Sequence, residues 1–120
     1  SSILQKSLNV SVEDNIRTGL SHLLISKVGD QERRHVLLVS ASLMNQRGIE
    51  WAARDMHNTS TTTQSSFLQL LLHRVRIEID LHLDPNNSEA KKAAAAREQI
   101  LAVCFIIVEN VLVALVLQAG

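Results

Sequence analysis

The sequence is poor in the residues on which nucleic-acid binding depends. Aromatic residues make up only 2% of the chain, with one Trp, two Phe and no Tyr, so it lacks the stacking platforms that hold single-stranded bases. Twelve Lys and Arg balance twelve Asp and Glu, which leaves no net positive charge to attract a phosphate backbone. The composition therefore predicts no nucleic-acid partner.

Glycine and proline are also scarce. Four Gly and one Pro among 120 residues are fewer than the turns of an all-β protein need, whereas 46% of the residues are hydrophobic. A chain of this length supports one compact domain. We therefore expect one all-α unit of antiparallel helical hairpins, either a four-helix bundle or a fragment of an armadillo/HEAT-like solenoid.

The chain has a single cysteine, Cys104, which lies inside an apolar run. An internal disulfide and a cysteine-based zinc site are both excluded, which favours a reducing, cytoplasmic location. Residues 1–6 lack the apolar core of a signal peptide, in agreement with that location. Because Cys104 precedes Phe105 and Ile106, we expect its thiol to have a raised pKa and to be unreactive.

Hydrophobic periodicity predicts helices at about 12–28, 31–46, 66–83 and 89–118. Ser11 and Asp30 are the predicted N-caps of the first two helices, and Gly29 and Gly48 their C-terminal glycines. The short link at Gly29 predicts that these two helices form an antiparallel hairpin. Residues 58–66 contain no apolar side chain, and we expect them to form a mobile loop.

Two further segments are open to interpretation. The turn that contains Trp51 is predicted to insert this side chain into the first hairpin. Segment 67–83 shows the strict alternation of a strand from Val75 onward, but it also has one apolar helical face. A helix would place Arg74 next to Glu78 and Arg76 next to Asp80, and no second alternating strand is present to complete a sheet. We therefore expect a helix.

The run from Ile100 to Leu117 is almost wholly apolar and long enough to span a bilayer. Glu109 and Asn110 lie in its middle, where a carboxylate is costly in lipid. We therefore predict a buried core helix, and a membrane-tethered helical protein anchored by residues 100–117 is the alternative. Within a core, Glu109 would need a partner, and we expect Arg74 or Arg76 of the preceding helix to provide it.

Motifs for catalysis or cofactor binding are absent from the sequence. It has neither a phosphate-binding glycine loop nor a Gly-x-Ser-x-Gly elbow. Glu78 and His82 have the spacing of two metal ligands on a helix, and His73 or Asp80 would be the third ligand, but such pairs are common in charged helices. We predict no enzyme activity, cofactor or metal site. The candidate structural or interface residues are Trp51, Arg74, Arg76, Glu78 and Glu109.

Four motifs in a fixed order resemble the neurochondrin family. They are Gly48-x-Glu50-Trp51, then Phe67-Leu68-x-Leu70-Leu71, then Ile77-Glu78-x-x-Leu81, and finally Glu98 leading to Ala102-x-Cys104-Phe105-x-x-x-Glu109. The likeness covers about residues 29–109. Asp80 departs from it, because an arginine is common there, and the run after Glu109 is more apolar than the family pattern.

The resemblance implies an armadillo-like solenoid without enzyme activity. It also implies a cytoplasmic adaptor that binds other proteins in signalling and trafficking, best known in neurite outgrowth. Members of the family are much longer than 120 residues, so the resemblance further implies that this chain is a fragment. We accordingly expect protein partners, and packing against further helical repeats or self-association.

Overall fold

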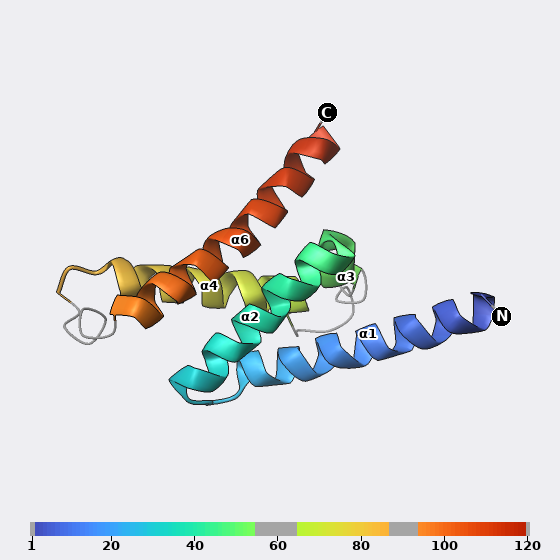
Figure 1. The fold of residues 1–120 in the computed structure, drawn as a ribbon, viewed down its shortest axis with the longest axis horizontal. Helices are drawn as coiled ribbons and strands as arrows, with labels where there is room; N and C mark the ends of the chain where they lie inside the picture. The colour runs from blue at the N-terminus through green and yellow to red at the C-terminus, as the bar shows by residue number, and fades with distance from the viewer. Residues whose placement is uncertain (1, 55–64, 87–93, 120) are drawn as a thin grey trace.

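The computed structural model describes residues 2–54, 65–86 and 94–119, and every regular element within these ranges is a helix. The elements are α1 (Ser2–Ile25), α2 (Asp30–Arg47), α3 (Ile49–Ala53), α4 (Phe67–Leu83) and α6 (Ala94–Ala119). Figure 1 shows them packed against one another, with the C-terminal part of α6 extending outward. The predicted all-α fold is confirmed.

The helices form two antiparallel hairpins, α1–α2 and α4–α6, that stack side by side. Helix α1 packs on α4, and α2 packs on α6. In Figure 1, α1 and α4 run in one direction and α2 and α6 run in roughly the opposite one. Equivalent helices of the two hairpins therefore lie next to each other, as they do in neighbouring units of helical-repeat proteins.

The core lies between the two hairpins and includes side chains from all five described helices. Its largest fully buried members are Leu37, Met44, Trp51, Phe67, Leu71, Ile100 and Ile107, and Leu20 is the contribution of α1. Helix α1 differs from the expected stripe, because Ile16 and Leu23 are exposed and Arg17 is buried. One face of α1 thus carries a buried cation that apolar periodicity does not reveal.

The ends of α1 differ from the prediction. The helix begins at Ser2, so Ser11 is not its N-cap, because the residues before Ser11 include no Gly or Pro to interrupt it. It ends at Ile25, where the Ser26 hydroxyl donates to the His22 carbonyl at 2.7 Å. Gly29 has φ −70° and serves as the N-cap of α2, with Asp30 as the first helical residue. The predictions of Gly29 as the C-terminal glycine of the first helix and of Asp30 as the N-cap of the second are therefore wrong.

The predicted stop at Gly48 is confirmed. Gly48 adopts φ 83° and ψ 171°, and its N–H donates to the Met44 carbonyl at 2.9 Å. This backbone conformation is almost restricted to glycine. It redirects the chain from α2 into the short helix α3, and so places Trp51 over the core.

Segment 67–83 is the helix α4, and the strand interpretation is wrong. A capping box begins it, in which the Ser66 hydroxyl accepts from the Gln69 N–H at 3.3 Å and the Gln69 side chain accepts from the Ser66 N–H at 2.9 Å. Most of the predicted loop 58–66 lies outside the described residues. The expected start of the last helix at residue 89 also lies outside them.

Candidate interaction surface

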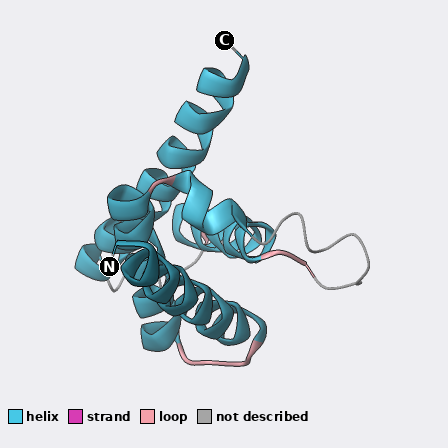
Figure 2. Cartoon of the chain, turned by 90° about the vertical axis from the view of Figure 1, so that its right-hand side faces the viewer, coloured by secondary structure: helices cyan, strands magenta, loops and turns pink. Residues whose placement is uncertain are grey.

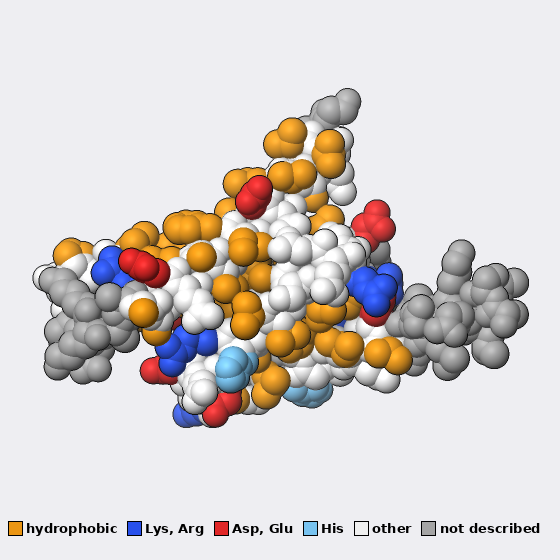
Figure 3. Space-filling view, in the orientation of Figure 1, with side chains coloured by type: hydrophobic (Ala, Val, Ile, Leu, Met, Phe, Trp, Pro, Cys, Tyr) orange, Lys and Arg blue, Asp and Glu red, His pale blue; other side chains and the backbone are white. Residues whose placement is uncertain are grey.

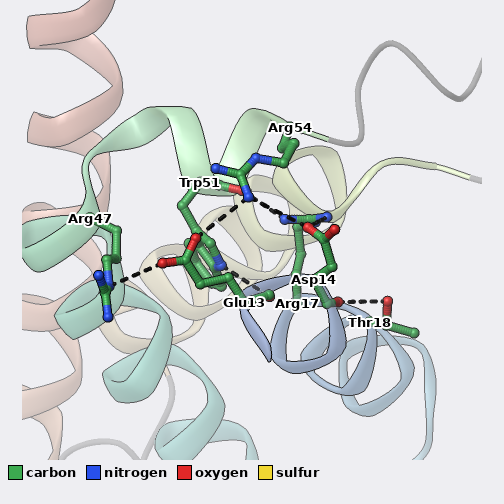
Figure 4. A network of polar contacts seen from close by, with 7 residues as sticks. All are labelled: Glu13, Asp14, Arg17, Thr18, Arg47, Trp51 and Arg54. Carbon is green, nitrogen blue, oxygen red and sulfur yellow. Dashed lines mark hydrogen bonds and ion pairs between the residues drawn. The ribbon is translucent and has the colours of Figure 1, made fainter. Parts of the chain in front are cut away.

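Trp51 joins three segments that are distant in the sequence. Its side chain is 1% exposed and meets Phe67 edge to face, with ring centroids 5.2 Å apart. The indole N–H donates to the Glu13 carbonyl at 3.2 Å, and Arg17 donates to the Trp51 carbonyl at 3.2 Å (Figure 4). Trp51 is therefore a structural anchor and does not itself present a contact surface.

A set of ion pairs surrounds this anchor (Figure 4). The Glu13 carboxylate lies 3.3 Å from Arg47 Nε and 3.5 Å from Arg54 Nη1, and Arg17 pairs with Asp14 at 2.6 Å. Sequence reasoning missed Glu13 and Arg17, because polar residues on a buried face do not contribute to hydrophobic periodicity. A signal was available, since Glu13 and Arg17 continue the helical spacing of Leu20.

Glu78 is a buried carboxylate that links α4 to α2. It accepts a hydrogen bond from Arg74 Nε at 3.0 Å, and its oxygens lie 3.7 Å from Arg33 Nε and 3.3 Å from His82 Nε2. The expected pairing of Arg74 with Glu78 is confirmed. Because two arginines from different helices share one carboxylate, this cluster fixes how the hairpins meet.

Arg76 and Asp80, the other expected pair, lie 4.0 Å apart with both side chains largely exposed. Such a pair contributes little to stability. His73 and Asp80, the other candidate metal ligands, do not complete a site around Glu78 and His82. The described ranges contain no group of three potential metal ligands. The Glu78–His82 contact is therefore part of the buried charge cluster.

Cys104 is fully buried beside this cluster. Burial, followed by the nearby Glu78 carboxylate, raises the pKa of its thiol to about 11, against a smaller lowering effect of Arg74. The predicted rise is confirmed. At neutral pH the thiol is protonated and poorly nucleophilic.

The expected ion pair of Glu109 with Arg74 or Arg76 is wrong. Glu109 is exposed and lines a cavity of about 220 Å³ together with Asn45 of α2. Arg74 is instead bound within its own helix by Glu78. The neighbouring Asn110 provides the polar link, since its amide donates to the Asn45 side chain at 2.9 Å. Exposure to water removes the need for a counter-ion at Glu109.

Helix α6 has a buried first half and an exposed second half. Ile100, Val103, Cys104 and Ile107 are buried between α2 and α4. Beyond them the apolar side chains Leu112, Val113, Leu115, Val116 and Leu117 are all more than half exposed. Figure 3 shows hydrophobic side chains continuing onto the outward-extending end of α6. The prediction of a buried helix thus holds for the first half alone.

An apolar ridge runs along one side of α6 and includes residues of both halves of the helix. Leu101, Phe105, Val108 and Leu112 follow one another at spacings of four, three and four residues, so they lie on one side of the helix. We call this set the outer ridge. Phe105 is 53% and Leu112 55% exposed, whereas Leu101 and Val108 are half-buried. An aromatic and three aliphatic side chains at helical spacing form a surface onto which another helix can pack.

Length and composition alone also qualify α6 as a membrane span. The segment Ala95–Gln118 is the one candidate within the described residues, and 22% of its most apolar stretch is buried in the protein. A mostly buried core helix of a soluble protein can pass the same test, but most of this stretch is exposed. Figure 2 shows the end of α6 directed away from the remaining helices.

A second surface feature is a groove between α2 and α6. It has a volume of about 300 Å³, and its walls are Gln31, Arg34 and His35 on α2 and Gln99 on α6. Leu38, Ile100 and Val103 provide its apolar part. The outer ridge and this groove are two features of the described surface that a partner could contact.

Comparisons with known proteins match the chain to one family. The model of the neurochondrin family matches residues 1–118. No curated protein and no solved structure matches the chain. Because the family model covers nearly every residue, the chain belongs to the neurochondrin family.

Proposed function

We propose that this chain is part of a non-enzymatic scaffold that binds other proteins in the cytoplasm through helical-repeat surfaces. The outer ridge is the observation that carries the proposal, because an apolar ridge of this kind on a stacked hairpin offers a packing face to a further protein element. Membership of the neurochondrin family, with the adaptor role that the resemblance implies, agrees with it.

The stacking of the two hairpins supports this proposal. Helix α2 covers the side of α6 that carries Val103, whereas the outer ridge lies on a different side. Helix α4 presents Leu70, Ile77 and Leu81 at helical spacing, and none of the three is fully buried. A further helical layer on α4 and α6 would extend the same side-by-side stacking.

The chemistry of the described residues also supports a role without catalysis. The most buried carboxylate, Glu78, is paired with arginines, and the Cys104 thiol has a raised pKa. Neither group has the properties of a general base or an activated nucleophile at neutral pH. A scaffold that assembles other proteins in signalling or trafficking requires neither a general base nor an activated nucleophile.

The second candidate function is a membrane tether that inserts α6 into a bilayer. The exposure and length of Ala95–Gln118 favour it. Insertion of the whole segment, however, would withdraw Ile100, Cys104 and Ile107 from the core. These side chains would remain in an apolar environment within the bilayer, but the faces of α2 and α4 that they cover would lose their packing partners.

The two candidates differ in how the protein partitions between water and lipid. We would produce the 120-residue chain without detergent, then measure its helicity by circular dichroism and its flotation with phosphatidylcholine vesicles. The scaffold proposal expects a soluble, helical protein that does not float. A requirement for detergent, or flotation of most of the protein, would overturn it in favour of the tether.

Matched substitutions on α6 sharpen this test. Leu112→Glu lies on the outer ridge, and Ile107→Glu lies in the core of the same helix. The scaffold proposal expects Leu112→Glu to keep the fold and Ile107→Glu to unfold it. If Ile107→Glu also remains folded, the described core is wrong. If Leu112→Glu alone abolishes membrane association, the ridge faces lipid and not a protein.

A further inference from the structure

We propose that the groove between α2 and α6 at Arg34 binds an acidic segment of a partner protein. The proposal deepens the scaffold function, on which it rests, by naming the chemical class of one ligand. The site is separate from the outer ridge, because the groove lies where α6 meets α2.

Unbalanced charge at the groove is the first observation. Arg34 is half-buried, yet it has neither an ion pair nor a hydrogen bond to any described residue. Most other arginines of the chain do have such partners: Arg17, Arg33, Arg47, Arg54, Arg74 and Arg76 all pair with carboxylates. No described residue that lines the groove is acidic. An external carboxylate would therefore supply the missing partner.

The position of the neutral polar groups is the second observation. Gln31 on α2 and Gln99 on α6 line opposite walls of the groove. Each amide can both donate and accept, as the backbone of an extended peptide requires. His35 lies on the same face of α2, one turn after Gln31 and directly after Arg34. The groove thus offers hydrogen bonds to a main chain beside a cation for a side chain.

The apolar part of the groove suits a peptide side chain. Ile100 and Val103 are buried beneath it, and Leu38 is 41% exposed at its edge. A volume of about 300 Å³ lies at the lower end of the range for ligand pockets and accommodates one or two side chains. The complementary ligand is therefore an acidic segment that contains an aliphatic residue next to a carboxylate.

This chemistry favours a peptide over a nucleotide or an anionic lipid surface. A polyphosphate carries several charges, which are usually met by glycine-rich backbone or several cations. The groove has one arginine and an apolar floor. A single carboxylate bound by the planar Arg34 guanidinium fits these groups better.

The test is an NMR titration of the soluble 15N-labelled chain with two defined peptides. One is an acetylated nine-residue peptide with a central leucine flanked by glutamates, and the other has lysines in place of the glutamates. We expect the acidic peptide to shift the amide resonances of residues 31–38 and 99–103. We expect no such shifts from the basic peptide.

Two arginine variants complete the experiment. Arg34→Gln removes a side chain without a described partner, so the fold should persist while affinity for the acidic peptide falls about tenfold or more. Arg97→Gln, on α6 but outside the groove lining, is the control and should bind like the original chain.

Several results would overturn the groove proposal. These are the absence of shifts with the acidic peptide, equal binding by Arg34→Gln, or equal shifts with inorganic phosphate or phosphatidylserine vesicles. If the chain is soluble and fails to bind the peptide, the groove proposal alone fails. If the chain floats with phosphatidylcholine vesicles, the scaffold function fails as well.

Discussion

The indole N–H of Trp51 donates a hydrogen bond to the backbone carbonyl of Glu13, 3.2 Å away. This contact joins α3 to α1, and the edge-to-face contact with Phe67 joins α3 to α4. Trp51 is the sole tryptophan, and the chain has no tyrosine. Its fluorescence therefore reports on the place where α1, α3 and α4 meet.

Arg17 should be more important for stability than its position on a long exposed helix suggests. In Arg17→Met, the Trp51 carbonyl loses its 3.2 Å donor, and a buried acceptor without a partner costs about 1–3 kcal/mol. Urea unfolding followed by Trp51 fluorescence measures this loss. Arg54→Met, which removes longer and more exposed ion pairs of 3.5 and 3.6 Å, should cost less than about 1 kcal/mol. Equal losses of stability in the two variants would contradict the role of Trp51 as a structural anchor.

Gly48 and Gly19 should respond in opposite directions to alanine. At Gly48 the positive φ of 83° strains any side chain, so Gly48→Ala should lower the free energy of unfolding by about 1–3 kcal/mol. Gly19 lies inside α1 with no atom within 4 Å of an added Cβ, and Gly19→Ala should stabilise by about 0.5–1 kcal/mol. Thermal unfolding measures both changes. A neutral Gly48→Ala would show that α2 does not end as described.

Glu78 should be far less tolerant of neutralisation than Asp80 on the same helix. Glu78→Gln leaves Arg74 and Arg33 without their shared carboxylate, and we expect a loss of about 2–4 kcal/mol in the free energy of unfolding. Asp80→Asn breaks an exposed pair of 4.0 Å and should change stability by less than about 0.5 kcal/mol. Chemical denaturation measures the free energy of unfolding of both variants. Similar losses in the two variants would contradict the role of Glu78 in a buried charge cluster.

Cys104 should make stability fall at alkaline pH. Its folded-state pKa of about 11 exceeds the ordinary value of 9.0, so below pH 9 the thiol is protonated in both the folded and the unfolded states. Between pH 9 and 11 the unfolded chain loses the proton more readily, which favours unfolding as the pH rises. We expect Cys104→Ala to have a shallower decline over this window, measured by urea denaturation at several pH values. If the stability of Cys104→Ala falls as steeply with pH as that of the original chain, the raised pKa of Cys104 is contradicted.

Apolar periodicity was sufficient to predict where the helices lie, but not the start of α1 or the cap at Gly29. The pairing of Arg74 with Glu78 follows from their spacing of four residues on a helix, which a single sequence contains. The end at Gly48 was predictable for the same reason, because few other residues can adopt that turn.

Long-range relationships were not predictable in the same way. The partner of Trp51 is a backbone carbonyl 38 residues away, and a carbonyl has no sequence signature. Glu109 was expected to pair with Arg74 or Arg76 because it lies in an apolar helix, but its exposure depends on which side of α6 faces α2. The groove at Arg34 likewise arises from two helices that meet more than 60 residues apart.

The orientation of α6 is the most direct test of the scaffold account. In a Cys104→Ala background, Phe105→Cys places a thiol on the outer ridge, and Ile107→Cys places one in the core. We would measure maleimide labelling rates with and without phosphatidylcholine vesicles. The account expects rapid labelling at 105 that vesicles do not change, and labelling at 107 about 100-fold slower or more, because it requires local opening. Similar rates at both positions, or protection of 105 by vesicles, would contradict it.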